Sequence, residues 1–158
     1  MKYFKSDLWL KMQKELTKNM AEKQWLINSE LYKSYFNTIR DKLPPKFIKI
    51  YDEENGFHDC IIKEITIKSI ERKTKRDTIN FLIVLSNGTV NYFIEFKNAE
   101  IIKMNVSSNI YCICGRISWG YSEFEILDNK KIKLSILCDV INEIELIFDN
   151  IVINKKQV

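Results

Sequence analysis

Hydrophobic residues recur at helical spacing in the first third of the chain. Apolar residues recur at three- and four-residue intervals, as on one face of an amphipathic helix, and this face comprises Phe4, Leu8, Trp9, Met12, Leu16 and Met20. Ser6 has a side chain suited to an N-cap, so we expect the first helix to begin there. This pattern predicts a helical start to the fold.

A second helix is predicted over 21–42, with an interruption at Asn28-Ser29 left open. Pro44-Pro45 ends it, because proline lacks an amide hydrogen and excludes helical geometry from the preceding residue. A short helix over 47–53 then leads to Asn55-Gly56, a pair suited to a left-handed helix stop. The apolar face of the second helix comprises Leu31, Tyr32, Tyr35, Phe36, Ile39 and Leu43.

Beyond residue 57 the apolar residues alternate instead, which is typical of strands. Cys60 and Ile62 share one parity, whereas Ile65 and Ile67 share the other. A bulge near 63–64 would bring all four to the core side of one strand.

Asn87-Gly88 predicts a tight hairpin, because this pair favours the two-residue type I′ turn. Ser86 would then face Thr89. The apolar pairs that follow are Leu85 with Val90, Ile83 with Tyr92, Phe81 with Ile94, and Ile79 with Phe96.

The remaining chain predicts further strands joined by tight turns. A stretch over 110–127 is too long for one straight strand, so we expect a bend at Gly115 or Gly120. A turn at 128–130 would place Phe124 opposite Leu134. Other strands are predicted at 99–106, 132–138, 144–148 and 151–153.

These elements predict an α+β fold. Two or three N-terminal helices would pack on a curved antiparallel β-sheet, or on a small β-sandwich, of about seven strands. We expect a single domain over 1–158, with a helical front end (1–56) and an antiparallel β body (57–158).

Composition adds few constraints. The 158 residues carry a net charge of +4, with acidic residues interleaved among the basic ones, so a polyanionic partner is only weakly favoured. No stretch has the length of a membrane span, and the start of the chain lacks the features of a signal peptide. We therefore expect a cytoplasmic protein with reduced cysteines.

His58-Asp59 is the first candidate for chemistry, since His58 is the only histidine. Metal-dependent phosphohydrolases use a His-Asp pair, but they need further histidines to hold the metal, and catalytic zinc usually takes three protein ligands. A structural role at the junction of helix and sheet is the main alternative, followed by contact with a ligand or partner. A metal-dependent hydrolase is the least favoured function.

Cys112 and Cys114 invite comparison with a zinc site. On a strand, residues two apart lie about 6.6–6.8 Å from each other, too far for two sulfurs on one zinc ion. We therefore interpret them as buried small hydrophobic residues, and Cys60 and Cys138 likewise.

The segment 68–76 is the main basic cluster. A charged hairpin end that protects sheet edges is the simplest interpretation. The alternative is an RNA contact in which Tyr92, Phe93 and Trp119 stack on bases. Their position in alternating apolar runs favours the core instead.

Residues 119–125 form the second candidate site. Parity places Trp119, Tyr121 and Glu123 on one face, where they would form an aromatic and acidic binding surface. The alternative is that Gly120 marks a bulge and Trp119 belongs to the core. Both interpretations stay open from the sequence.

Several of these short motifs together resemble an uncharacterised bacterial family of unknown function. They are Met1-Lys2-Tyr3-Phe4, Leu43-Pro44-Pro45, Phe57-His58-Asp59-Cys60, and Trp119-x-Tyr121 with Glu123. The third is similar to a Leu-His-Asp-Ala strand entry, with Phe57 and Cys60 as mild departures. Some relatives of that family are grouped with immunity proteins of polymorphic-toxin systems, and the resemblance implies at most a binding role.

The sequence therefore favours a non-enzymatic protein-binding module, immunity-like under this resemblance. The expected binding residues are His58, Asp59, Trp119, Tyr121 and Glu123. We expect no catalytic residue, no metal and no cofactor. The expected partner is another protein; RNA binding through 68–76 is the alternative.

Overall fold

The computed structural model describes residues 1–71, 77–106, 116–139 and 142–158. Its helices are α1 (Ser6–Met12), α2 (Lys18–Ile39) and α3 (Pro45–Glu53), with 3₁₀ turns η1 (Arg40–Lys42) and η2 (Asn55–Phe57). The prediction of an α+β fold with N-terminal helices is confirmed.

Two helix details differ from prediction. Lys5, not Ser6, occupies the N-cap of α1, and no side chain caps that end. α2 runs without a break through Asn28, whose side-chain amide donates to the carbonyl of Tyr3 at 2.9 Å. Because this amide bonds to a distant segment, it does not compete with the helix backbone.

The described strands form two antiparallel sheets. One has five strands in the order β5-β1-β2-β3-β9, and the other has four in the order β4-β8-β7-β6. The prediction of about seven strands was therefore low by two. Their bounds are β1 Cys60–Ile70, β2 Thr78–Ser86, β3 Val90–Lys97, β4 Glu100–Asn105, β5 Ser118–Trp119, β6 Tyr121–Ile126, β7 Ile132–Leu137, β8 Glu143–Phe148 and β9 Asn150–Gln157.

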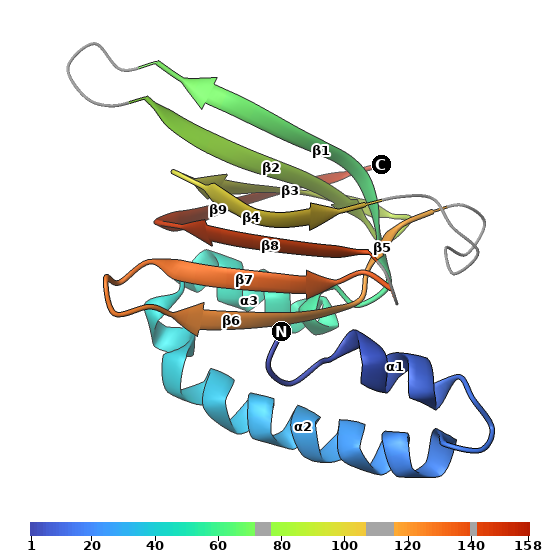
Figure 1. Cartoon of the computed structure of the whole chain (residues 1–158). Helices are drawn as coiled ribbons and strands as arrows, with labels where there is room; N and C mark the ends of the chain where they lie inside the picture. The colour runs from blue at the N-terminus through green and yellow to red at the C-terminus, as the bar shows by residue number, and fades with distance from the viewer. Residues whose placement is uncertain (72–76, 107–115, 140–141) are drawn as a thin grey trace.

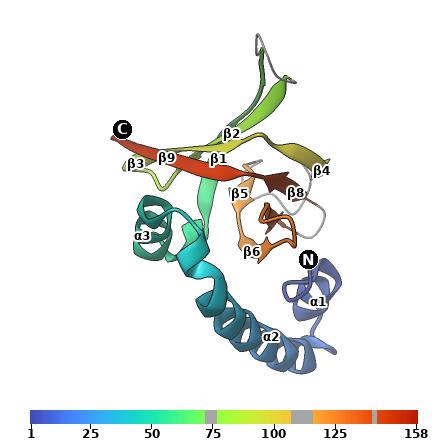
Figure 2. The ribbon, with the colours of Figure 1, turned by 90° about the vertical axis from the view of Figure 1, so that its left-hand side faces the viewer.

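The two sheets are joined at a corner. β3 continues into β4 and β8 into β9, and each pair of strands bends where the chain passes Asn98 and Asp149. Asn98 has a φ of 52° and donates to Asp149 at 2.6 Å. The sheets thus curl into a half-barrel, seen end-on in Figure 2.

The helices close the concave side of this half-barrel. α2 runs along β6, and α3 lies behind β6, near β9 (Figure 1). Aromatic rings fill the space between: Phe47 of α3 packs against Phe124 of β6 at 5.5 Å between centroids, and Phe96 packs against Phe148 across the sheets at 4.9 Å. None of the helices in the described ranges is long and apolar enough to cross a membrane.

The β2–β3 hairpin has the predicted faces but another register. Leu85 pairs with Tyr92 and Phe81 with Phe96, two residues away from the prediction. Asn87 does not have positive φ, so the type I′ turn was wrong. Its side-chain oxygen instead accepts hydrogen bonds from the backbone of Thr89 and Val90, which makes a wider turn. A shift of two residues keeps every side chain on its face.

Three other strand predictions are confirmed. The β1–β2 register shifts between Ile62 and Glu64, as a bulge requires. Phe124 lies opposite Leu134. The chain changes sheet at Gly120, where a Cβ would lie 2.4 Å from the carbonyl oxygen of Leu137. Ile67 departs from prediction: 48% of it is exposed, because the end of β1 extends past the core.

Candidate functional site

An unusual backbone conformation marks the segment before β1. Asn55, Gly56, Phe57 and Asp59 have φ values of 47°, 70°, 61° and 67°. Left-handed backbone is uncommon for residues other than glycine, and for a bulky residue such as phenylalanine it is a clear outlier. Such outliers cost of order 1–3 kcal/mol each and concentrate at functional sites.

Phe57 anchors this segment in the core. Its side chain is fully buried, with ring centroids 5.7 Å from Tyr51 and 5.7 Å from Trp119. The next turn is held by the backbone, because the amide of Asp59 donates to the carbonyl of Trp119 at 2.9 Å. Burial of Phe57 offsets the backbone strain and fixes the direction of the residues that follow.

His58 and Asp59 project from this anchored segment toward solvent. His58 Nδ1 lies 3.0 Å from Asp59 Oδ2, and the two side chains are 31% and 83% exposed. The His58 ring meets the ring of Tyr121 edge-on, with 4.7 Å between centroids. The contact with Asp59 and the ring contact with Tyr121 together restrict the orientation of the imidazole, while most of the Asp59 side chain stays exposed.

Two adjoining cavities lie beside this pair and together form what we term the seam groove. One, of about 180 Å³, is lined by residues that include His58, Tyr121 and Ser122. The other, of about 340 Å³, extends along α2. Both are lined by Tyr32, Tyr51, Asn55 and Gly56.

Each wall of the seam groove comes from a different part of the chain. Ser29, Lys33, Asn37 and Arg40 line one side at helical spacing on α2 and η1. Asp52 of α3 lines the other side and forms an ion pair with Arg40. The groove is therefore polar at its rim, with aromatic rings beneath.

The tyrosines of the seam groove are kept neutral. Burial raises the pKa of Tyr51 to about 12, partly offset by a hydrogen bond of 2.8 Å between its hydroxyl and Ser122 Oγ. Burial also raises the pKa of Tyr32, whose hydroxyl accepts from the amide of Phe124 at 2.7 Å. Burial and the charge of Asp59 raise the pKa of Tyr121. At neutral pH these phenols are uncharged, and the hydroxyls of Tyr32 and Tyr51 form internal hydrogen bonds.

Only part of the predicted site comes together. His58, Asp59 and Tyr121 are neighbours, whereas Trp119 is fully buried, as in the second interpretation of this stretch. Glu123 is also buried, and its carboxylate accepts from the backbone amides of Lys2, Tyr3 and Phe4 at 2.6–2.7 Å. The exposed aromatic and acidic surface predicted for 119–125 is therefore wrong.

The predicted cysteine and basic motifs lie partly outside the described residues. Cys112 and Cys114 fall there, as do residues 72–76 of the basic cluster. Cys60 and Cys138 are buried, as predicted, and burial raises the pKa of Cys60 to about 11. Within the described ranges, no group of three His, Cys, Asp or Glu side chains could hold a metal ion.

Two of the three aromatic residues considered for stacking on RNA bases are buried. Tyr92 and Trp119 belong to the core, and Phe93 alone of the three lies on the convex face of the sheet.

Sequence reasoning missed most of the seam groove. The α2 wall could have been recognised from one sequence pattern: next to the buried face of this helix, polar residues recur every four positions at Ser29, Lys33 and Asn37. Tyr51 and Ser122 carry none, since their contact joins residues 71 positions apart.

Comparison with protein-family models, with curated proteins and with solved structures finds no match to this chain.

Proposed function

We propose that this chain is a protein-binding module that holds an extended segment of a partner protein in the seam groove. The observation that carries the proposal is the left-handed backbone of Asn55, Gly56, Phe57 and Asp59. Strain of this kind persists only where the surrounding structure enforces it, and here it places His58 in the wall of the groove with Asp59 beside it.

The charges of the groove suggest what the partner segment carries. Asp59 is exposed next to His58, which lines one cavity of the groove, and no described Lys or Arg forms an ion pair with it. Lys33 lines the cavity along α2, is exposed, and forms no ion pair with a described residue. We therefore expect the segment to place a basic side chain near Asp59 and an acidic one near Lys33.

An immunity-like role, in which the module occupies the surface of a toxin, is one form of this proposal. It rests on the resemblance of the short motifs described above, and the groove would be the contact surface.

Selection from a random peptide library displayed on phage tests the proposal. We expect the purified chain to select peptides that combine a basic and an acidic residue. Binding should weaken at least tenfold in Asp59→Lys and in Lys33→Glu, since each substitution opposes like charges. Glu15→Lys, at an exposed position of the α1–α2 turn, serves as a charge-matched control for Asp59→Lys.

Two results would overturn the proposal. One is the absence of any selected peptide while the protein is folded by circular dichroism. The other is a set of peptides that bind wild type, Asp59→Lys and Lys33→Glu equally well.

A further inference from the structure

Among the described residues, one of the two edges of β1 is unpaired over most of its length. β2 pairs with one side from Ile61 to Ile70, whereas β5 pairs with the other side only at Cys60 and Ile61. The amide of Ile62 still donates to the carbonyl of Ile117. From Lys63 to Ile70 no described residue pairs with the outer edge, so its backbone groups are available to another strand.

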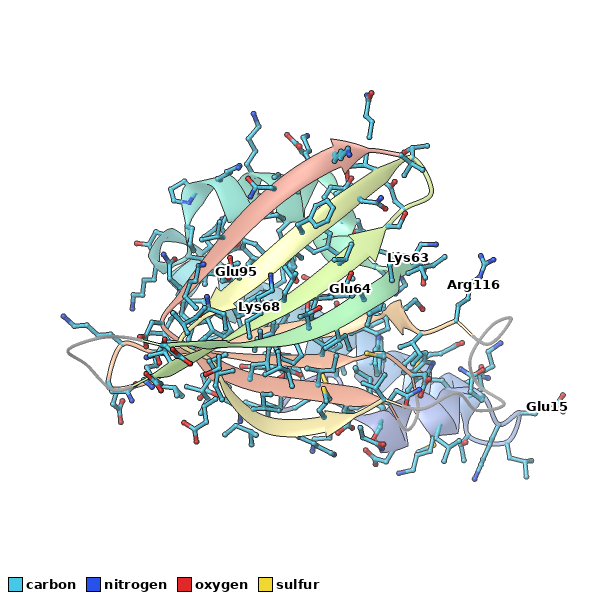
Figure 3. All side chains as sticks on the ribbon, turned by 90° about the horizontal axis from the view of Figure 1, so that it is seen from above. Glu15, Lys63, Glu64, Lys68, Glu95 and Arg116 are labelled. Carbon is cyan, nitrogen blue, oxygen red and sulfur yellow. The ribbon has the colours of Figure 1, made fainter. Side chains whose placement is uncertain are left out.

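The side chains along this open edge alternate between the two faces of the sheet. Glu64, Thr66 and Lys68 lie opposite Val84, Leu82 and Asn80 on the convex face, where Figure 3 shows Glu64 and Lys68 above the strand. Ile65 and Ile67 lie on the concave face. Neither Glu64 nor Lys68 forms an ion pair with a described residue. The hydrogen bond from Lys97 is the main cause of the lowered pKa of Glu95, and the charge of Lys68 lowers that pKa further.

We propose that β1 pairs antiparallel with β1 of a second copy of this chain, with Thr66 opposite Thr66 on a two-fold axis. In this register Glu64 faces Lys68 of the partner copy, and Lys68 faces its Glu64. Ile65 likewise faces Ile67 in both directions. The overlap covers 63–69 and ends where β5 begins to occupy the edge.

Alternative registers lack this match. Residues directly opposite each other in an antiparallel pair lie on the same face of the sheet. The two-fold axis must therefore pass between two copies of the same residue, and that residue defines the register. Centring on Ile65 places Glu64 opposite Thr66 and Ile62 opposite Lys68. Centring on Ile67 places Lys68 opposite Thr66 and Glu64 opposite Ile70. Only the Thr66 register joins both pairs of opposite charges.

Charged residues on an edge strand ordinarily prevent unwanted pairing. Here the two signs are placed symmetrically about Thr66, so the same charges that repel an unrelated strand attract an identical one. Cross-strand pairs of opposite charge stabilise a sheet, and like charges directly opposite each other destabilise it. The proposed surface is separate from the seam groove and does not depend on the proposed function.

The expected dimer is weak. Pairing of one short strand makes an interface at the small end of the known range, so we expect a Kd of roughly 10–100 µM. Sedimentation equilibrium over a range of concentrations measures it with the full chain.

Charge reversal provides the decisive experiment. Glu64→Lys and Lys68→Glu should each raise the Kd at least about tenfold, because each turns both attractive pairs into repulsive ones. The double variant Glu64→Lys/Lys68→Glu should restore the wild-type Kd. Mixing the two single variants should give a heterodimer, since each then supplies the charges that the other lacks.

Glu15→Lys is the matched control for Glu64→Lys, because it makes the same charge change at an exposed position distant from β1 (Figure 3). Its Kd should equal that of wild type. Circular dichroism verifies that every variant is folded.

Three results would overturn the proposal. The wild-type chain could remain monomeric up to roughly 1 mM, well above the expected Kd. The dimer could survive both single reversals, which would place it on another surface. The double variant and the mixture could both fail to dimerise, which would exclude the Thr66 register.

Discussion

Two strand edges, the outer edge of β6 and the part of β1 that lies beyond the short strand β5, differ in how the rest of the molecule covers them. α2 covers the free edge of β6, and the hydroxyl of Tyr32 accepts from the amide of Phe124 there. The N-terminal segment covers its outer face through Glu123. β1 has no such cover among the described residues from Lys63 to Ile70. An exposed strand edge can pair with another strand. The covered edge of β6 therefore contributes to stability, whereas we propose the exposed part of β1 for assembly.

The largest expected effect comes from truncating the core of the closed edge. Phe124→Ala should lower the free energy of unfolding by about 3–5 kcal/mol, because a buried ring packed against Phe47 and Tyr51 is lost. Ile67→Ala at the open edge should cost less than about 1 kcal/mol, since that side chain is half exposed. Urea denaturation at low protein concentration measures both. Equal losses would contradict the distinction between the edges.

The next effect concerns the N-terminal segment. Glu123→Ala should cost about 2–3 kcal/mol, because three backbone amides lose a charged acceptor and the segment detaches from β6. Glu125→Ala, at an exposed position of the same strand, is the control and should change stability by less than about 0.5 kcal/mol. Thermal and urea unfolding of both variants would test this, and a small effect of Glu123→Ala would show that the segment contributes little.

A smaller effect is expected at alkaline pH. Folding raises the pKa of Tyr51 from 10.0 to about 12. The contribution of the neutral Tyr51 hydroxyl to the free energy of unfolding is therefore fully present below pH 10 and is lost as pH rises through 12. At pH 11 the loss should be on the order of 1 kcal/mol. Tyr51→Phe should remove that part of the pH dependence. The measurement is the difference in unfolding free energy between pH 9 and 11, with Tyr35→Phe as a control; identical slopes in wild type and Tyr51→Phe would refute the assignment.

The strand pattern allowed much of the β body to be predicted, and the failures have local causes. The β6–β7 register followed from apolar residues on both sides of a short turn. The β2–β3 register did not, because Asn87 uses its side chain as a backbone acceptor and widens the turn. The predicted extension of the first helical face to Leu16 and Met20 was wrong: the helix ends at Met12, with no proline or glycine to mark its end, and both side chains are exposed.

The candidate site was predicted only where its residues adjoin in sequence. His58 and Asp59 were identified because they are neighbours at the start of a strand. Glu123 was placed on the wrong surface, since its bonding partners lie about 120 positions away and Gly120 moves the chain to the other sheet. Contacts of this kind depend on tertiary packing, and a period of two along one strand does not reveal them.

The smallest expected effect separates stability from binding. Asp59→Gly should change the free energy of unfolding by less than about 1 kcal/mol, because glycine adopts positive φ readily and the carboxylate is exposed. The same substitution should weaken binding of a groove-selected peptide, since it removes the charge that faces the partner. Unfolding and peptide titration of one sample make the comparison, and a large loss of stability would indicate a structural role for Asp59.

Amide hydrogen exchange as a function of protein concentration tests the contrast between the two edges most directly. We predict that the amide of Phe124 exchanges slowly at every concentration, because Tyr32 accepts its hydrogen bond. The outward-facing amides of 63–70 should exchange rapidly in dilute samples and become protected as concentration rises. Protection of these β1 amides in dilute samples, or exchange that stays rapid at concentrations well above the expected Kd, would contradict the account.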